Sequence, residues 1–150
     1  MPDDVTKRHA LPNLYVGQSY KEITHNEALA RIDALLHPVV ESKMSAPPLG
    51  LTDDSDGLCW LINGQATGQW AGRSGQIARW SGGSWRYLEP VSGMTLWLAS
   101  GNKRLFYIAG AWIETGAIIS PAGGTVIDIE ARAAVAAILD HLRQISSVPA

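Results

Sequence analysis

The spacing of apolar residues changes several times along this chain and predicts five segments. Residues 1–22 are polar and broken by prolines and a glycine, which is typical of an extended arm. In residues 23–41 apolar side chains recur on one helical face, so we predict a helix there. Thr24, followed by Glu27, has the spacing of a capping box, and Pro38 is expected to end the helix. The apolar face of this helix consists of Ala28, Leu29, Ile32, Leu35, Leu36 and Val39.

A linker and a β region follow this helix. Residues 42–57 combine paired prolines with small and acidic residues, so we predict a linker. In residues 58–118 short runs rich in aromatic side chains alternate with glycine-containing turns, which is the pattern of antiparallel β-hairpins. Gly82-Gly83 can supply the positive φ angles that a tight two-residue hairpin turn requires.

Two of the predicted hairpins resemble copies of each other. The sequence IARWSGGSW places Trp80 five residues before Trp85, and LFYIAGAW places Tyr107 five residues before Trp112. Both run from an apolar strand through an aromatic residue and a small-residue turn to a tryptophan. The two pairs lie 27 residues apart, so we predict two related hairpin units packed together.

Residues 119–150 return to helical spacing, and Thr125 is a candidate N-cap. Apolar residues recur there at the alternating spacing of four and three that forms a coiled-coil seam. The seam consists of Ala131, Val135, Ile138, Leu142 and Ile145. This helix either associates with other copies or lies on the sheet of its own subunit, and we favour association. The pattern predicts one α+β domain: an N-terminal arm and helix, a central Trp-rich antiparallel β-hairpin unit and a C-terminal amphipathic helix.

Composition narrows the choice of partners. Charged residues make up only 17% of the chain, the formal net charge is −2, and acids and bases are interleaved. Because no basic stripe could follow a phosphate backbone, nucleic acid is not an expected partner. The N-terminus lacks the apolar core of a signal peptide and no apolar run could cross a bilayer, so we expect synthesis in the host cytoplasm and no membrane insertion. Low charge together with six tryptophans favours association with other subunits.

The residues that usually carry catalysis or bind metals do not form a recognisable constellation. Cys59 lies in an apolar run without a Cys-His motif, and His25 and Asn26 stand at a helix start without the second histidine of a zinc helix. The β region holds only Glu89 and Glu114, so a glycan-degrading enzyme is a remote alternative. We therefore expect a protein that is not an enzyme and has no metal and no cofactor.

Aromatic surface is the strongest candidate for binding. Tryptophan offers a flat apolar face and an N–H donor, which suit stacking on sugars or anchoring a partner protein. We expect about four of the six tryptophans in the core or an interface and about two near a ligand surface. The candidate stacking residues are Trp70, Trp85, Tyr87 and Trp112.

The stretch LPNLYVGQSYKEITHNEALARIDALL resembles the N-terminal signature of an uncharacterised domain family of alphaproteobacterial phages, prophages and gene-transfer agents. Members read like Gln-Ala-Gln-Lys-His-Val-Thr-His-Asn-Glu-Ala-Leu. The chain departs from this at Ser19, Tyr20, Glu22 and Ile23. The resemblance continues through the Trp-Ala-Gly and Gly-x-Trp patterns of the β region and into the C-terminal segment. The matching positions are Gln18, Lys21, Thr24, His25, Asn26, Glu27, Ala28 and Leu29.

This resemblance implies a non-enzymatic virion protein, such as a tail-fibre, tail-tip or adaptor component that is displayed toward the host. A carbohydrate-binding host-recognition module that contacts a surface glycan, or a head fibre or decoration protein, is the alternative. Docking on other virion proteins, or capping of the first helix, would involve Gln18, Lys21, Thr24, His25, Asn26 and Glu27.

We also expect a homotrimer. Host-facing fibres that resemble this family are generally trimeric. The C-terminal seam points the same way, because mixing β-branched residues at both core positions does not favour a dimer. Two heptads are too short to hold three chains unaided, so the β units are expected to touch as well.

Overall fold

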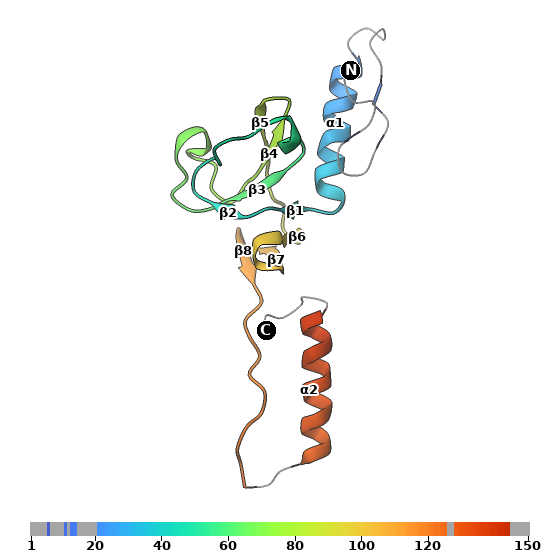
Figure 1. The fold of residues 1–150 in the computed structure, drawn as a ribbon, viewed down its shortest axis with the longest axis vertical. Coiled ribbons are helices and arrows are strands. Elements are labelled where there is room, and N and C mark those ends of the chain that lie inside the picture. Colours follow the sequence, from blue (N-terminus) through green and yellow to red (C-terminus); the bar gives the residue numbers. More distant parts are fainter. Residues whose placement is uncertain (1–5, 7–10, 12, 15–20, 126–127, 145–150) are drawn as a thin grey trace.

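A computed structural model describes residues 6, 11, 13–14, 21–125 and 128–144. One helix lies beside two small sheets, and a second helix stands apart from them at the end of an extended segment (Figure 1). This arrangement confirms the predicted α+β class. The helices are α1 (Lys21–Leu36) and α2 (Ile129–Gln144), with short 3-10 turns η1 (Asp53–Ser55), η2 (Gly68–Trp70) and η3 (Ala99–Gly101). The strands are β1 (Val39–Val40), β2 (Lys43–Met44), β3 (Cys59–Ile62), β4 (Ile77–Ser81), β5 (Ser84–Leu88), β6 (Thr95–Leu98), β7 (Lys103–Ile108) and β8 (Ala111–Glu114).

Helix α1 extends further toward the N-terminus than predicted. It already includes Lys21, so Thr24 stands inside the helix and the predicted cap at Thr24 is wrong. Lys21 and Glu22 both have high helix propensity, which explains why the helix begins before Thr24. Its other end is as expected: α1 stops at Leu36, because a proline at position 38 disfavours helical backbone in the residue before it.

Two four-stranded sheets share one topology. Their strand orders are β1-β6-β7-β8 and β2-β3-β4-β5. In each, a two-residue strand runs parallel to the first strand of an antiparallel three-stranded meander. Trp80 pairs with Trp85 and Tyr107 pairs with Trp112, each across a two-residue turn whose residues have positive φ. The predicted pair of related hairpins is therefore confirmed, and the relation includes the strand that precedes each hairpin.

A single backbone segment, Pro38 to Met44, joins the two sheets. The N–H of Trp97 donates to the carbonyl of Pro38 at 2.8 Å, which extends the first sheet. On the second sheet, the N–H of Leu61 donates to the carbonyl of Ser42 at 3.0 Å. Strand β1 lies in the last residues of the segment 23–41 and strand β2 in the first residues of the segment 42–57. Neither strand was predicted, because a two-residue strand is too short to show an alternating pattern.

The second sheet is covered on both faces, and strand β3 is buried along its whole length. Leu61 and Ile77 point into a core that reaches α1 and the first sheet. Trp60 and Ala78 point to the opposite face, into a tryptophan cluster. Within that cluster the rings of Trp60, Trp70 and Trp80 each meet the ring of Trp85 edge-on, with centroids 5.0 to 5.5 Å apart.

Helix α2 begins later than predicted. The side chain of Asp128 accepts a hydrogen bond from the N–H of Ala131 at 2.8 Å, so Asp128 is the N-cap and the prediction of Thr125 is wrong. The helix stands apart from both sheets, which contradicts the alternative in which it lies on the sheet of its own subunit (Figure 1). Ile145, the last predicted seam residue, lies outside the described residues. Neither described helix is long and apolar enough to span a membrane.

Trp70 provides a test of the tryptophan cluster. Its side chain is fully buried and its ring lies against Trp85, so we expect Trp70→Ala to lower the free energy of unfolding by about 3–5 kcal/mol. Trp70→Phe should cost less than half as much, because it keeps a ring in the cluster and removes an indole N–H that has no partner. Chemical denaturation measures both. Leu49→Ala, at a fully exposed position, is the control and should have little effect; equal costs for the two Trp70 variants would contradict the packing role.

Candidate functional site

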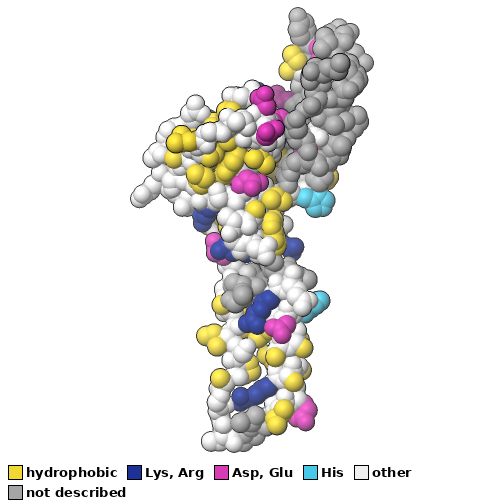
Figure 2. Space-filling view, in the orientation of Figure 1, with side chains coloured by type: hydrophobic (Ala, Val, Ile, Leu, Met, Phe, Trp, Pro, Cys, Tyr) yellow, Lys and Arg dark blue, Asp and Glu magenta, His cyan; other side chains and the backbone are white. Residues whose placement is uncertain are grey.

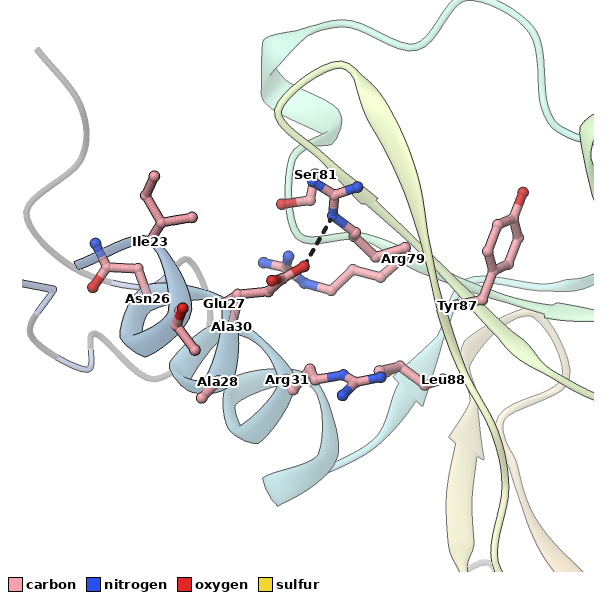
Figure 3. A pocket seen from close by; sticks show the side chains of 12 residues that line it. Ile23, Asn26, Glu27, Ala28, Ala30, Arg31, Arg79, Ser81, Tyr87 and Leu88 are labelled. Atoms are coloured by element: carbon pink, nitrogen blue, oxygen red, sulfur yellow. Dashed lines mark ion pairs between the residues drawn. The ribbon is translucent and has the colours of Figure 1, made fainter. Parts of the chain in front are cut away.

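A cleft of about 660 Å³ lies between α1 and the hairpin of β4 and β5 (Figure 3). Helix α1 contributes Glu27 and Arg31, which reach toward the sheet, and β4 contributes Arg79, which points toward α1. Apolar and polar side chains together complete its walls. The remaining lining residues are Ile23, Thr24, Asn26, Ala28, Ala30, Ser81, Arg86, Tyr87 and Leu88.

Strand pairing brings two arginines together in this cleft. Arg79 on β4 is the direct antiparallel partner of Arg86 on β5, so both side chains leave the sheet on the face that meets α1. Arg79 is only 4% exposed, and its Nε has no hydrogen-bond partner in the structure. On its other side Arg79 pairs with Cys59 of β3, whose thiol is buried. The cleft therefore has a buried guanidinium group at its base.

One ion pair crosses the mouth of the cleft. The Nε of Arg86 lies 3.8 Å from a carboxylate oxygen of Glu27, and both side chains are more than half exposed. Such an exposed, long pair contributes at most about 1 kcal/mol to stability. Arg31 lines the same cleft and is exposed. Three guanidinium groups thus face one carboxylate among the lining residues, and the cleft carries excess positive charge.

Residues 25–113 match the model of a family described as "Protein of unknown function (DUF2793)". The chain belongs to this family. The match covers most of α1 and both sheets, so it includes every element that lines the cleft, and it stops before α2. No curated protein matches the chain significantly. The phage and gene-transfer-agent origin implied by the sequence resemblance stays a prediction.

The signature at the start of this DUF2793 domain has two structural roles. The side-chain amide of Asn26 accepts a hydrogen bond from the N–H of Leu14 at 2.9 Å and donates one to the Leu14 carbonyl at 3.1 Å. Asn26 therefore holds Leu14 against α1 with the pair of bonds that a neighbouring strand would make. Glu27 and Thr24 face the cleft instead.

The other predicted docking residues have no such role in the described structure. Lys21 and His25 are exposed, and Gln18 lies outside the described residues. Among the described residues, no three side chains of histidine, cysteine, aspartate or glutamate gather as a metal site would need.

The arm has a second attachment in the interior. The hydroxyl of Thr6 donates to the fully buried carboxylate of Asp33 at 2.8 Å and accepts from the N–H of Leu11 at 3.0 Å. Asp33 lies on α1, so Thr6 and Leu14 contact the same helix at two different places. No sequence pattern points to this pairing, because Thr6 lies 27 residues from Asp33 in a segment without periodicity.

The predicted stacking residues do not form one surface. Trp70 is fully buried, so it offers no face to a ligand, and that prediction is wrong for Trp70. Trp85 is half-buried within the tryptophan cluster, and Trp112 packs against the other core while its indole N–H donates to the Gly75 carbonyl at 2.8 Å. The ring of Tyr87 is covered by the guanidinium of Arg73, 3.9 Å from the ring centroid.

Removing the Asn26 amide should release the arm. Asn26→Ala loses both bonds to Leu14, so we expect the free energy of unfolding to fall by about 1–2 kcal/mol and the Leu14 amide to exchange faster with solvent. Hydrogen exchange followed by NMR measures the second effect. Asn26→Asp keeps the acceptor and loses the donor, so its free energy of unfolding and its Leu14 exchange rate should lie between those of wild type and Asn26→Ala. His25→Ala, at the exposed neighbour, is the control; unchanged protection of Leu14 in Asn26→Ala would contradict the contact.

Proposed function

We propose that this DUF2793 protein is a non-enzymatic structural component of a phage or phage-derived particle, assembled as a homotrimer and displayed toward the host. The resemblance of its N-terminal signature and β region to virion proteins supports the particle role. The exposure of the α2 seam supports the assembly role, and this is the observation on which the proposal chiefly rests.

Three of the four described seam residues of α2 are exposed in the single chain. Ala131 and Val135 are exposed, Ile138 is 59% exposed, and Leu142 is half-buried. Leaving this seam in water costs the free energy that burying branched apolar side chains would yield. Apolar side chains are visible along the lower part of the molecule, where α2 lies (Figure 2). A helix with this spacing is typically buried against copies of itself.

The first sheet offers a second apolar surface near that helix. Phe106 pairs with Ile113, and Ile108 follows two residues after Phe106, so all three side chains leave the same face of β7 and β8. Ile108 and Ile113 are both about half exposed, at 54% and 46%. Contact between β units through this face would supply the additional burial that a two-heptad seam needs.

Charges placed in the seam test the trimer. We expect wild-type protein to sediment with the mass of three chains, and the double variant Ile138→Asp and Leu142→Asp to sediment as a monomer, because buried unpaired carboxylates are costly. Sedimentation equilibrium at micromolar concentration measures this. The matched control, Ala133→Asp with Ala137→Asp, puts the same charges at the same spacing on the opposite helix face and should stay trimeric. A monomeric wild type would end the trimer proposal.

The particle role has its own test. We expect an antibody against this protein to label intact particles of its source strain at one defined position, seen by electron microscopy of immunogold-labelled samples. Labelling at the tail supports a fibre, tip or adaptor, and labelling at the capsid supports a head fibre or decoration protein. Particles that contain no copy by mass spectrometry would contradict the proposal.

A further inference from the structure

The pair of Arg79 and Arg86 has an unfavourable arrangement within the protein. Two like charges that lie directly opposite each other on neighbouring strands destabilise a sheet. Burying a guanidinium group without full hydrogen bonding adds to that cost, and Arg79 is 4% exposed with an unpartnered Nε. The exposed Glu27 pairs with Arg86, and among the described residues no side chain forms an ion pair or hydrogen bond with the Arg79 guanidinium.

The fold itself does not require arginine at these positions. The two hairpins are related by a shift of 27 residues, which places Phe106 and Ile113 where the other hairpin has Arg79 and Arg86. Phe106 and Ile113 pair in the same register, so an apolar pair suits this place in the hairpin. An energetically unfavourable pair of side chains that the fold does not require is expected mostly at a functional site.

The cleft above the two arginines has the size and lining of a small-molecule site. Its volume of about 660 Å³ falls within the range of pockets that hold small ligands. Apolar walls from Ile23 and Leu88 could cover the face of a ring, and the hydroxyls of Thr24 and Ser81 could bond to ligand hydroxyls. A guanidinium group presents a planar fork of donors, which fits a carboxylate with two parallel hydrogen bonds.

We propose that this cleft binds a carboxylate-bearing sugar, such as a hexuronic acid unit, with its carboxylate on Arg79 and Arg86. Arg31 adds a third positive charge at the rim. Glu27 lines the same cleft, and its negative charge opposes a doubly charged phosphate more than a singly charged carboxylate. The inference depends on the cleft alone and holds whether or not the protein assembles as a trimer.

Glu27 has a defined role in this site. Without ligand, its carboxylate lies 3.8 Å from Arg86 and partly neutralises it. The ligand carboxylate must displace Glu27 or share Arg86 with it, so Glu27 weakens binding. The site therefore makes opposite demands on its two kinds of charge: loss of an arginine weakens binding, and loss of the glutamate strengthens it. A purely structural ion pair would produce no such opposition.

Calorimetric titration of the full chain with sodium glucuronate, at about 0.15 M NaCl, tests the ligand class. We expect saturable binding of glucuronate, no binding of glucose, and weaker binding of acetate, because acetate lacks the ring and hydroxyls. Absence of glucuronate binding overturns the proposal. Equal or tighter binding of inorganic phosphate, or equal binding of acetate, shows a general anion site and overturns the sugar assignment.

Variants test the residues. Arg86→Gln, at an exposed position that should not affect folding, is expected to weaken glucuronate binding by about tenfold or more, and Glu27→Gln to tighten it several-fold. Arg79→Met should abolish binding while the melting temperature stays equal or rises, because an unpaired buried charge is replaced by an apolar side chain. Arg104→Met removes the same charge at an exposed position of β7 and should leave binding unchanged.

The two arginine variants separate a site from a structural contact. If Arg79→Met fails to fold and Arg86→Gln binds glucuronate as tightly as wild type, Arg79 serves the fold alone and the proposal is wrong. The same holds if Arg104→Met weakens binding as much as Arg86→Gln, since the effect is then that of net charge. Because sedimentation measures assembly without ligand, failure here and failure of the trimer proposal are distinguishable.

Discussion

The backbone between Pro38 and Met44 is the constraint on which the remaining architecture depends. It has to satisfy the hydrogen-bonding groups of two sheets within seven residues, and it does so by giving β1 to one sheet and β2 to the other. Pro38 also ends α1 immediately before this segment. The position of the helix relative to the sheets is therefore fixed by a short covalent connection and by backbone bonds at its end. The cleft exists because α1 is held beside β4 and β5 in this way.

Successive side chains of β4 and β5 point to opposite faces of the sheet, which separates the charged residues of the cleft from the tryptophan cluster. Odd-numbered residues of β4, including Arg79, face α1, whereas Ala78 and Trp80 face the tryptophan cluster. One face therefore contributes to packing and the other lines the cleft. Edge-on aromatic packing fills one face, and the other face carries the charged cleft. A one-residue change of register would exchange these faces, so the cluster and the cleft depend on the same pairing.

The sequence predicted those features that have a local pattern. The helices, the hairpins and their internal similarity were all recognisable, because each repeats a period over several turns or strands. Even the pairing of Arg79 with Arg86 follows from the sequence, since both lie three residues from the Gly82-Gly83 turn. The burial of Arg79 could not be predicted, because it depends on α1 docking from far along the chain.

The other wrong predictions from the sequence also involve features that depend on contacts between distant segments. Strands β1 and β2 are too short to show alternation. Trp70 stands in a glycine-rich loop that reads as exposed, yet the turn η2 carries its ring into contact with Trp85. The cap of α2 is Asp128 rather than the predicted Thr125, because both residue types are good caps and only the observed hydrogen bond distinguishes them. Contacts between distant segments, rather than residue type, decided each of these cases.

The internal repeat would let one small domain carry both the proposed assembly surface and the proposed ligand site. Both hairpins keep an aromatic pair beside the turn, which preserves the register. The next pair toward the strand ends differs: it is apolar and partly exposed in β7 and β8, and charged in β4 and β5. In Figure 1 the hairpin of β4 and β5 lies beside α1, and the hairpin of β7 and β8 lies toward α2. Association through β7, β8 and α2 would therefore leave the cleft of β4 and β5 open, since the two surfaces belong to different copies of the same unit.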